Sequence, residues 1–446
     1  MMGRLEQQEA LFYDFNLEDH VPQGHLLRKI DQFLDLERLR AELARLYSPI
    51  GRPSIDPELM IRMLLVGYLY GIRSERQLCQ EVHLNLAYRW FCRLGLKGGV
   101  PERSTFSKNR HGRFANGDIL RRVFESVVRT CADHGLVGGT GALIDGSTVF
   151  ADANRDRRDA PDAVMHTWSE KDTVLRPVQA YLNPLQNAAP QSNEGPQHKP
   201  PKYISETDPQ AAWSLKDGPG CFSYEVNYLA DDKHAIIMDV EATPARLSQE
   251  IVAAKAMLER CLEDVGFDPS SIAADKSYGT GPFLSWLLKH EITPFVPVLD
   301  RKKQTDGKLT RDDFDYDPER DTYVCPQGHD LTLKSINRQT RVKRYKAKPG
   351  HCRACPIRES CTDSTQRSLV RLLDEEARQA ARDLADTDAF HEARRKRKKV
   401  EMLFAHLKRW QKLTRLRLRG LSGAKEEFLL AATAQNLKRL VKLAPS

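Results

Sequence analysis

The sequence has no long uncharged hydrophobic run and no apolar segment near its N-terminus. No stretch of its 446 residues approaches the roughly 18 apolar residues of a membrane-spanning helix. The first ten residues, MMGRLEQQEA, lack the apolar core of a signal peptide. We therefore expect a cytoplasmic protein with no membrane partner. With 40% hydrophobic residues the chain can still fill real cores, and its length predicts two to three domains.

Acidic residues are scarce at the C-terminal end of the chain. From His391 to Ser446 there are 16 Lys and Arg residues but only four Asp and Glu residues. This tail therefore has a net charge of +12, which leaves residues 1 to 390 with −4. A concentrated positive surface indicates a polyanionic partner, nucleic acid first of all. A solvated helix face is the alternative explanation of the same run.

Cysteines are sparse except for one cluster of four. Five of the nine lie singly among apolar neighbours, as reduced core residues do. The other four occur within CPQGH and CRACPIRESC, with a spacing that suits tetrahedral thiolate coordination of zinc. These candidate zinc ligands are Cys325, Cys352, Cys355 and Cys361. His329 or His351 could replace one thiolate, and four free thiols are the alternative.

The first 135 residues have the pattern of a helical domain. In SIDPELMIRMLLVGYLYG, Asp56 suits an N-cap, Pro57 the first helical position and Gly71 the end of the helix. A second helix begins after the short turn GIR. The pair resembles a helix-turn-helix, in which Arg73 and Arg76 would reach phosphates, although plain helix packing fits equally well. The stretch STFSKNRHGRF, residues 104 to 114, is another candidate basic helix.

Residues 136 to 299 predict the first part of an α/β domain. Three strands are expected in GALIDGSTVFADA, CFSYEVNYLAD and KHAIIMDVEAT, followed by helix, strand, helix and strand. This order, βββαβαβ, predicts a mixed sheet. Residues 155 to 215 are expected to form a flexible insertion, because their centre is rich in Pro, Asn and Gln. Residues 300 to 390 predict a cysteine-rich insertion without a separate core. Residues 391 to 446 predict a long helix and the basic tail.

Three carboxylates stand out by their context. Asp145 in LIDGST and Asp275 in IAADKSYG each follow an apolar strand, where the sites of open α/β sheets collect. Carboxylates gathered at such an edge repel one another, and a divalent cation relieves that repulsion. A set without His or Cys favours Mg²⁺ or Mn²⁺. For either aspartate alone, a turn or helix cap is the more common role.

The third carboxylate is Glu401, directly behind the basic run RRKRKK. Helical spacing places Val400, Leu403, Phe404 and Leu407 on one apolar stripe, which we expect to pack on the sheet. Glu401 then lies at the border of the stripe, on one face with the cations Arg394, Arg397 and Lys408. These cations could hold a nucleic-acid backbone while the acid holds a metal. A surface pair between Arg397 and Glu401 fits the spacing as well.

These three motifs together resemble those of the DDE transposases of bacterial insertion sequences, of the insertion sequence five and eleven-eighty-two groups. The family's third motif is Y-x2-R-x3-E-x6-K; here Arg397, Glu401 and Lys408 match it, and Arg394 stands in place of the tyrosine. In the second motif Ser277 and Gly279 replace the Gly and Asp of the pattern ADKGYD. The resemblance covers nearly the whole chain.

The resemblance implies a function for the whole chain. It implies a ribonuclease H-like catalytic domain with Asp145, Asp275 and Glu401 as a catalytic triad that binds Mg²⁺ or Mn²⁺, and an N-terminal DNA-binding domain. It further implies cleavage of double-stranded DNA at the element's inverted-repeat ends and joining of the 3′-OH ends to target DNA. Lys276 in the second motif becomes a further candidate DNA contact. Holding two ends together suggests a homodimer.

Two other functions fit parts of the same pattern. Helix pairs and a basic tail need no metal, so a non-catalytic DNA-binding protein is one alternative. A ribonuclease H-like nuclease acting on branched or hybrid nucleic acid is the other, since fold and metals do not choose the substrate.

Overall fold

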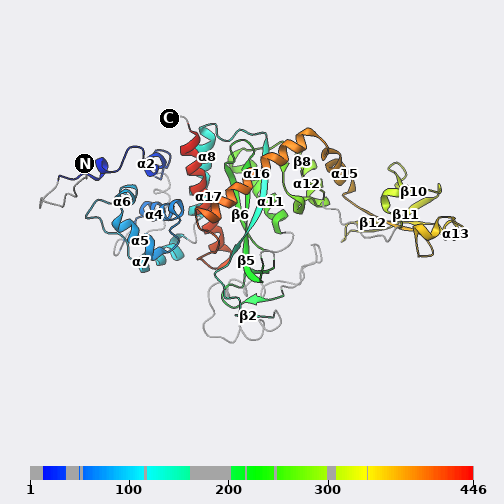
Figure 1. Cartoon of the computed structure of the whole chain (residues 1–446), viewed down its shortest axis with the longest axis horizontal. Helices are drawn as coiled ribbons and strands as arrows, with labels where there is room; N and C mark the ends of the chain where they lie inside the picture. Colours follow the sequence, from blue (N-terminus) through cyan, green and yellow to red (C-terminus); the bar gives the residue numbers. More distant parts are fainter. Residues whose placement is uncertain are drawn as a thin grey trace, which may run out of the picture.

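The structure is a computed structural model. It describes residues 14–36, 50, 54–114, 118–160, 202–215, 218–245, 249–298, 308–338 and 340–444. Along the long axis, N-terminal helices lie at one end, a sheet with its covering helices lies in the middle, and a smaller sheet lies at the other end (Figure 1). Within these described ranges, no helix combines the length and the apolar composition that a membrane crossing requires.

The N-terminal helices begin and end at the expected capping residues. The Asp56 side chain accepts a hydrogen bond from the backbone N–H of Glu58 at 2.8 Å, and Gly71 ends the helix with a left-handed φ of 68°. The helices are α1 (Leu17–His20), α2 (Leu26–Asp31), α4 (Pro57–Tyr70), α5 (Glu75–Leu84), α6 (Leu86–Phe91), α7 (Arg103–Asn109) and α8 (Ile119–Asp133). The expected basic helix over 104–114 is α7 followed by a π-helical turn, Arg110–Phe114.

The central sheet is mixed, so the predicted α/β class is confirmed. Its strands are β1 (Gly141–Phe150), β4 (Ala212–Ser214), β5 (Cys221–Asp231), β6 (Ile237–Pro244), β7 (Ser271–Ala273) and β8 (Thr293–Phe295). β5 pairs antiparallel with β1 on one side and with β6 and β4 on the other, while β7 and β8 continue the sheet in parallel with β1. β1 and β5, which lie at the centre of this sheet, are the longest of these strands.

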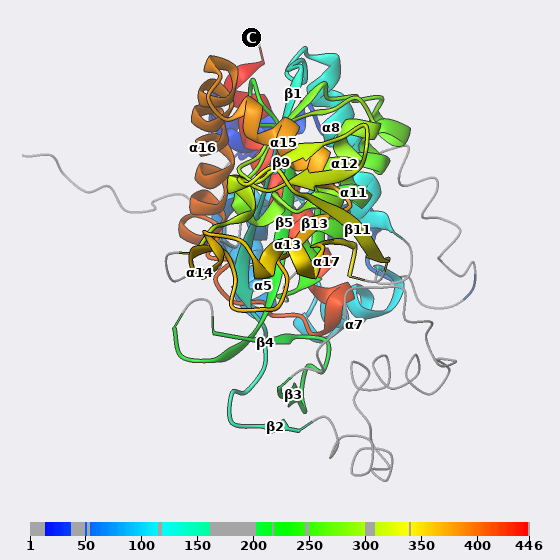
Figure 2. The same ribbon diagram turned by 90° about the vertical axis from the view of Figure 1, so that its right-hand side faces the viewer.

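Helices cover both sides of this sheet. They are α11 (Gln249–Arg260), α12 (Gly281–Lys289), α15 (Glu375–Leu384), α16 (Asp388–Arg409) and α17 (Gly420–Leu443). Seen from the end of the smaller sheet, α16 flanks the strands on one side and α11 and α12 on the other (Figure 2). The stripe predicted for α16 is confirmed, because Val400, Leu403, Phe404 and Leu407 are all buried. The Phe404 ring stacks on Tyr228 of β5, with ring centroids 4.8 Å apart.

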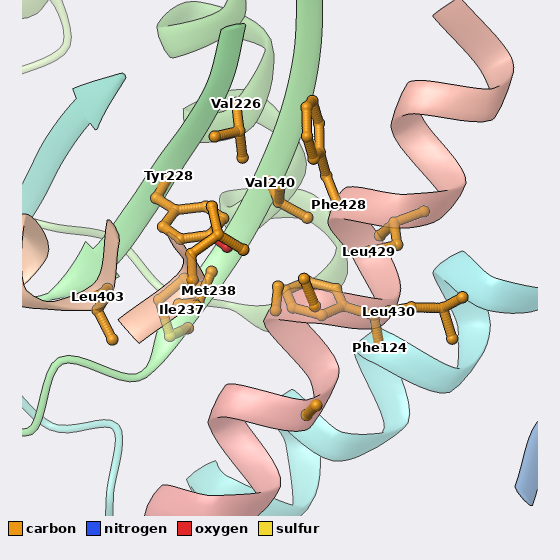
Figure 3. Close-up of a cluster of buried hydrophobic side chains, with 14 of the residues drawn as sticks. Phe124, Val226, Tyr228, Ile237, Met238, Val240, Leu403, Phe428, Leu429 and Leu430 are labelled. Atoms are coloured by element: carbon orange, nitrogen blue, oxygen red, sulfur yellow. The ribbon is translucent and has the colours of Figure 1, made fainter. Parts of the chain in front are cut away.

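The C-terminal helix α17 joins the N-terminal helices to the sheet. Its residues Phe428, Leu429 and Leu430 lie between Phe124 of α8 and side chains of β5 and β6 such as Val240 (Figure 3). The buried residues of the N-terminal helices and of the central sheet therefore form one continuous hydrophobic core. We call this part of the molecule the main body.

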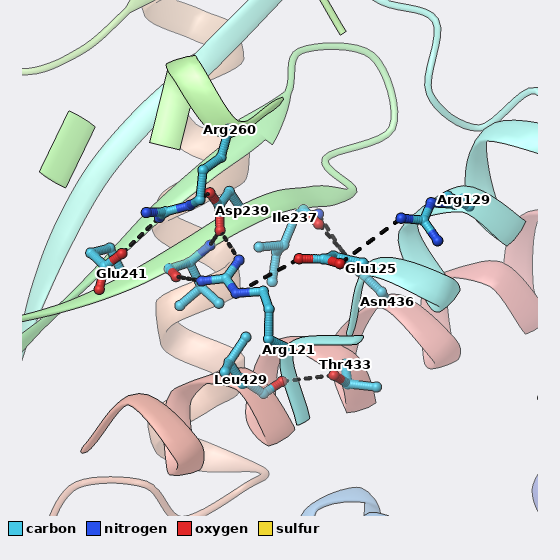
Figure 4. Close-up of polar contacts among 11 residues, drawn as sticks. Arg121, Glu125, Arg129, Ile237, Asp239, Glu241, Arg260, Leu429, Thr433 and Asn436 are labelled. Atoms are coloured by element: carbon cyan, nitrogen blue, oxygen red, sulfur yellow. Dashed lines mark hydrogen bonds and ion pairs between the residues drawn. The ribbon is translucent and has the colours of Figure 1, made fainter. Parts of the chain in front are cut away.

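Paired polar groups fix α8, α11 and α17 to the edge strand β6. Arg121 of α8 and Arg260 of α11 both bind Asp239, the latter at 2.8 Å (Figure 4). Asn436 of α17 accepts from the Ile237 N–H at 2.9 Å and donates to its carbonyl oxygen at 2.8 Å. These side chains satisfy backbone groups of an edge strand that would otherwise face solvent or another chain.

The insertion predicted over residues 155 to 215 is ordered at both ends. Its centre, 161–201, lies outside the described residues, but β2 (Arg158–Asp159) pairs with β3 (Ile204–Ser205), and β4 pairs with β5. Asp208 is fully buried; it accepts from the Tyr224 hydroxyl at 2.6 Å and from the Gly420 N–H at 3.1 Å. Residues 202–215 of this predicted insertion contact the first turn of α17, through Asp208 and through Gln210, which accepts the Leu421 N–H at 2.7 Å.

Residues 308–372 fold around a hydrophobic core of their own, and we call them the cysteine unit. The expectation of an insertion without a core was wrong. A five-stranded antiparallel sheet in the order β13-β12-β11-β10-β9 buries Phe314, Tyr323, Leu331, Tyr345, Ala347, Cys361 and Leu369. The strands are β9 (Asp315–Asp317), β10 (Thr322–Val324), β11 (Asp330–Asn337), β12 (Val342–Ala347) and β13 (Ser368–Leu372), with short helices α13 (Pro349–Arg353) and α14 (Arg358–Cys361).

Candidate acidic site on the central sheet

The register of two parallel strands brings Asp145 and Asp275 together. Leu143 of β1 pairs with Ala273 of β7, the last row of that ladder, and each aspartate lies two residues further along. Side chains two residues apart share one face of a sheet, so both carboxylates project from the same face where the two strands diverge. The sequence led us to expect Asp145 at the end of a strand. It lies instead in the middle of β1, because β1 continues to pair with β5 as far as Phe150.

Helix α16 brings Glu401 to the same place, with an arginine between the acids. The Arg397 guanidinium lies 3.3 Å from the Asp145 carboxylate and 2.7 Å from the Glu401 carboxylate. The predicted surface pair between Arg397 and Glu401 is present, but the same guanidinium also reaches the central strand. Asp145 is mostly buried and Glu401 is half exposed. A single cation therefore links the acid on the sheet to the acid on the helix.

The pKa of Asp145 depends on burial and on the nearby charges, including those of Asp275 and Glu401. Burial raises the pKa of Asp145 from 3.8 to about 6, against the opposing effects of Arg397 and of the Gly146 N–H. The Asp275 and Glu401 carboxylates raise this pKa further, as like charges do. The Gly146 N–H donates to Asp145 at 2.9 Å and holds its side chain. The three acids thus act on one another, and a second positive charge would be favoured here.

Sequence reasoning missed a fourth acid. The Ser277 hydroxyl lies 2.5 Å from the Asp275 carboxylate and 2.7 Å from that of Glu250 in the first turn of α11. The Ser277 N–H also donates to Asp275 at 2.8 Å. Ser277 is one of the two residues that depart from the family pattern, and here it holds Asp275 in place. In the sequence Glu250 has only the signature of a first-turn helix acid, which does not point to a site.

The oxygen donors suit a hard divalent cation, although they are not gathered around one point. Within the described residues, no three His, Cys, Asp or Glu side chains are grouped closely enough to hold a metal ion. Instead Arg397 bridges two of the acids. The chemistry of the set, three mutually repelling carboxylates without a nitrogen or sulfur donor, fits Mg²⁺ or Mn²⁺.

The predicted DNA contacts have different surroundings. Arg394, Lys276 and Arg76 are exposed, and Lys408 is half buried on α16. Arg73 is different, because it forms an ion pair with Glu427 of α17 and lies over the Tyr68 ring, 4.7 Å from its centroid. Only 9% of its side chain is exposed, which does not favour a role in binding phosphate.

Cys325 lies in the turn after β10, Cys352 in α13, Cys355 between α13 and α14, and Cys361 at the end of α14. The rings of His329, in the turn after Cys325, and His351 of α13 stack with centroids 4.2 Å apart. The Cys325 sulfur accepts the His329 N–H and the Cys352 sulfur accepts the Arg367 N–H, each at 3.4 Å. Burial raises the pKa of the Cys361 thiol, and the thiols of Cys352, Cys355 and Cys325 raise it further. None of the four is in a disulfide.

Comparison with known proteins gives two family matches. Residues 15–112 match the family described as a transposase domain (DUF772), and residues 324–441 match a transposase DDE domain, a range that includes Glu401 but neither aspartate. No curated protein matches the chain. One solved structure, the cryo-EM structure of a piggyBac transposase synaptic complex with hairpin DNA, matches with 10% identity and a TM-score of 0.34, over 94% of this chain and 74% of that one. The two family matches support a DDE transposase of insertion-sequence type.

Proposed function

We propose that this protein is an active transposase, which cleaves DNA at the ends of its own element and joins the exposed 3′-OH ends to target DNA. The observation that carries this proposal is the register of β1 and β7, which projects Asp145 and Asp275 from one face of the sheet, with Glu401 linked to Asp145 through Arg397. A chain with transposase domains needs such a set of acids for phosphoryl transfer.

In this proposal Asp145, Asp275 and Glu401 hold Mg²⁺ or Mn²⁺. The bound metal supplies the activation of the attacking oxygen and the stabilisation of the leaving oxygen. The protein's own residues prepare the site: the Gly146 N–H orients Asp145, and Ser277 orients Asp275. Arg397 neutralises Asp145 and Glu401, and with those acids bound to metal its guanidinium would be available to a DNA phosphate.

We further propose that the central domain is ribonuclease H-like. Its elements follow the order β1, β5, β6, α11, β7, α12, β8 and then α16, apart from the small strands after β1, which agrees with the predicted order βββαβαβ and helix. A sheet ordered β6-β5-β1-β7-β8 supports this assignment, because its first three strands are antiparallel and its last two follow β1 in parallel. In such a sheet both aspartates project from one face, just beyond the last paired row of β1 and β7.

DNA contacts in this proposal come from the exposed cations around the acids. Lys276 follows Asp275 directly, while Arg394 and Lys408 lie on α16 on either side of Glu401. Arg76 at the start of α5 would contact DNA outside the cleavage site. Two copies of the chain would hold the two ends of one element. The cysteines Cys325, Cys352, Cys355 and Cys361 would bind one structural Zn²⁺, in line with the N–H···S bonds to two of them.

The test is cleavage of a duplex that carries the element's end, with Mg²⁺ or Mn²⁺ present. Asp145→Ala, Asp275→Ala and Glu401→Gln should each lower cleavage at least about a thousandfold, while binding of the same duplex persists. Glu392→Gln, an exposed acid two turns earlier on α16, is the matched control and should cleave normally. Normal cleavage by Glu401→Gln would refute the triad. Binding without any cleavage by the unsubstituted chain would favour the non-catalytic alternative.

A further inference from the structure

The cysteine unit contains a basic segment that the whole-chain charge conceals. Residues 331 to 357 contain eight Lys and Arg residues and no Asp or Glu, although residues 1 to 390 together have a net negative charge. The segment comprises most of β11, all of β12 and α13, and the turn with Cys355. Its charge is therefore displayed on one small sheet rather than along a tail.

Strand alternation sorts these side chains onto two faces. Tyr345 and Ala347 of β12 point into the small core, so Arg344 and Lys346 project from the opposite face. Across the ladders Arg344 pairs with Ser335 and Val370, and Lys346 pairs with Thr332 and Ser368. We call these three strands, seen from this side, the outer face of β11–β13. By strand geometry its two cations lie about 7 Å apart.

The acids of this sheet gather at its other end. Asp315 and Asp317 belong to β9 and Asp330 starts β11, and the exposed Arg320 pairs with Asp317 at 2.6 Å and with Asp330 at 3.1 Å. On the core side, Lys343 is paired with Asp321 at 2.8 Å. By the same alternation Asp330, next to the core residue Leu331, projects from the outer face of β11–β13, where it is paired with Arg320; β12 and β13 contain no acid. Arg344 is exposed and Lys346 is half buried.

We propose that the outer face of β11–β13 binds the phosphate backbone of duplex DNA, through Arg344 and Lys346 with the small polar residues Thr332, Ser335 and Ser368 beside them. The occupant follows from charge, because a surface with two cations and short hydroxyl side chains, on whose strands the one acid, Asp330, is paired with Arg320, suits a polyanion bound through its backbone. The inference rests on the proposed function in that DNA is already the substrate. It adds a second contact region, at the end of the molecule opposite the N-terminal helices (Figure 1).

The test is the salt dependence of binding to a labelled duplex of random sequence, measured by fluorescence anisotropy with the full chain. Each lost phosphate contact lowers the slope of log affinity against log salt by about 0.9. The double variant Arg344→Ala with Lys346→Ala should lower the slope by about 1.8 and weaken binding roughly tenfold to a hundredfold at about 0.1 M salt. Arg320→Ala, a paired cation on the same sheet, is the control and should change neither.

Two further measurements are needed. One separates an effect of charge from an effect of packing, and the other separates failure of this binding surface from failure of the proposed function. Exchanging the cations, Arg344→Lys with Lys346→Arg, should preserve the slope, whereas a packing role would be disturbed by it. If the alanine double variant keeps the salt slope of the unsubstituted chain and that chain binds normally, the outer face of β11–β13 does not bind DNA, and the proposed function is unaffected. No duplex binding by the unsubstituted chain would overturn both.

Discussion

The main body and the cysteine unit are stabilised in different ways. The main body has one continuous core that runs from Leu27 in α2 to Leu440 in α17, and buried charges such as Arg62, Asp239 and Glu427 are in ion pairs. The cysteine unit buries only seven residues in its core, two of them tyrosines whose hydroxyls are polar. About 65 residues around so small a core are below the size at which hydrophobic burial alone is enough. The second region therefore needs a further stabiliser, and the first does not.

This difference also separates two kinds of polar surface. In the main body, arginines such as Arg73, Arg121 and Arg260 are engaged with carboxylates between elements. In the cysteine unit, Arg344 and Lys346 project from the outer face of β11–β13, where the acid Asp330 is paired with Arg320. Arginines buried in ion pairs between elements are less accessible to a partner, so the exposed cations are the better guide to DNA contacts.

The largest expected effect concerns the cysteines. Replacing both Cys352 and Cys361 by serine should abolish zinc binding and unfold the cysteine unit, since structural zinc contributes about 10–16 kcal/mol in small domains. Hydrogen exchange of β10–β13 should then lose its protection. All five tryptophans lie outside residues 308–372, so the fluorescence melting of the main body should not change. Cys79→Ser in the main body is the control. One zinc per chain in the double variant would contradict the assignment.

The next largest effect should come from the buried acid of α17. Glu427 accepts the backbone N–H groups of Arg417 and Leu418, each at 2.6 Å, and pairs with Arg73. Glu427→Ala leaves a buried arginine without its partner, which costs about 3–5 kcal/mol. Denaturant unfolding followed by tryptophan fluorescence measures it. Glu392→Ala removes the exposed ion pair with Lys396 and should cost under about 1 kcal/mol. Equal losses of stability in the two variants would contradict the expected difference between a buried and an exposed ion pair.

A third effect depends on pH and concerns Asp208. Burial raises its pKa from 3.8 to about 6, so the folded chain holds this proton more tightly than the unfolded chain. Stability should therefore fall as pH rises from about 4 through 6, by roughly 3 kcal/mol. Asp208→Asn removes the ionisation, so its stability relative to the unsubstituted chain should improve by that amount between about pH 4 and pH 7. Asp145, also raised to about 6, is present in both proteins and cancels.

Local signals in the sequence were enough for most elements of the main body. The Asp56 cap, Pro57 and Gly71 fix α4 because capping depends on neighbouring residues, and the spacing on α16 identifies its buried stripe. Two features could not be predicted from the sequence: the position of α17 between the N-terminal helices and the central sheet, and the packing of residues 202–215. Both depend on contacts between residues far apart in the sequence, such as Asp208 with Gly420. The core of the cysteine unit was missed because its apolar residues are spread thinly among charges.

The acidic site was predictable in part for the same reason. The aspartates could be recognised from the strands that precede them, and their meeting follows from the pairing of Leu143 with Ala273, which no single segment encodes. The bridging contact of Arg397 to Asp145 and the link from Asp275 through Ser277 to Glu250 required three-dimensional neighbours. Charge summed over 390 residues likewise concealed the basic segment on β11 and β12.

The smallest expected effect compares Gly146 of the central sheet with Gly350 of the cysteine unit. At Gly146, beside Asp145, a Cβ atom would lie 3.1 Å from the Asn227 side-chain oxygen and 3.3 Å from the Glu225 side chain, so Gly146→Ala should cost about 1–3 kcal/mol by overpacking. Gly350 in α13 has open space around it, and Gly350→Ala should be neutral or stabilising by up to about 1 kcal/mol. Hydrogen exchange of β1 and of β12 measures both. Equal tolerance would mean that the central sheet is packed no more tightly around its acids than the cysteine unit is at its surface.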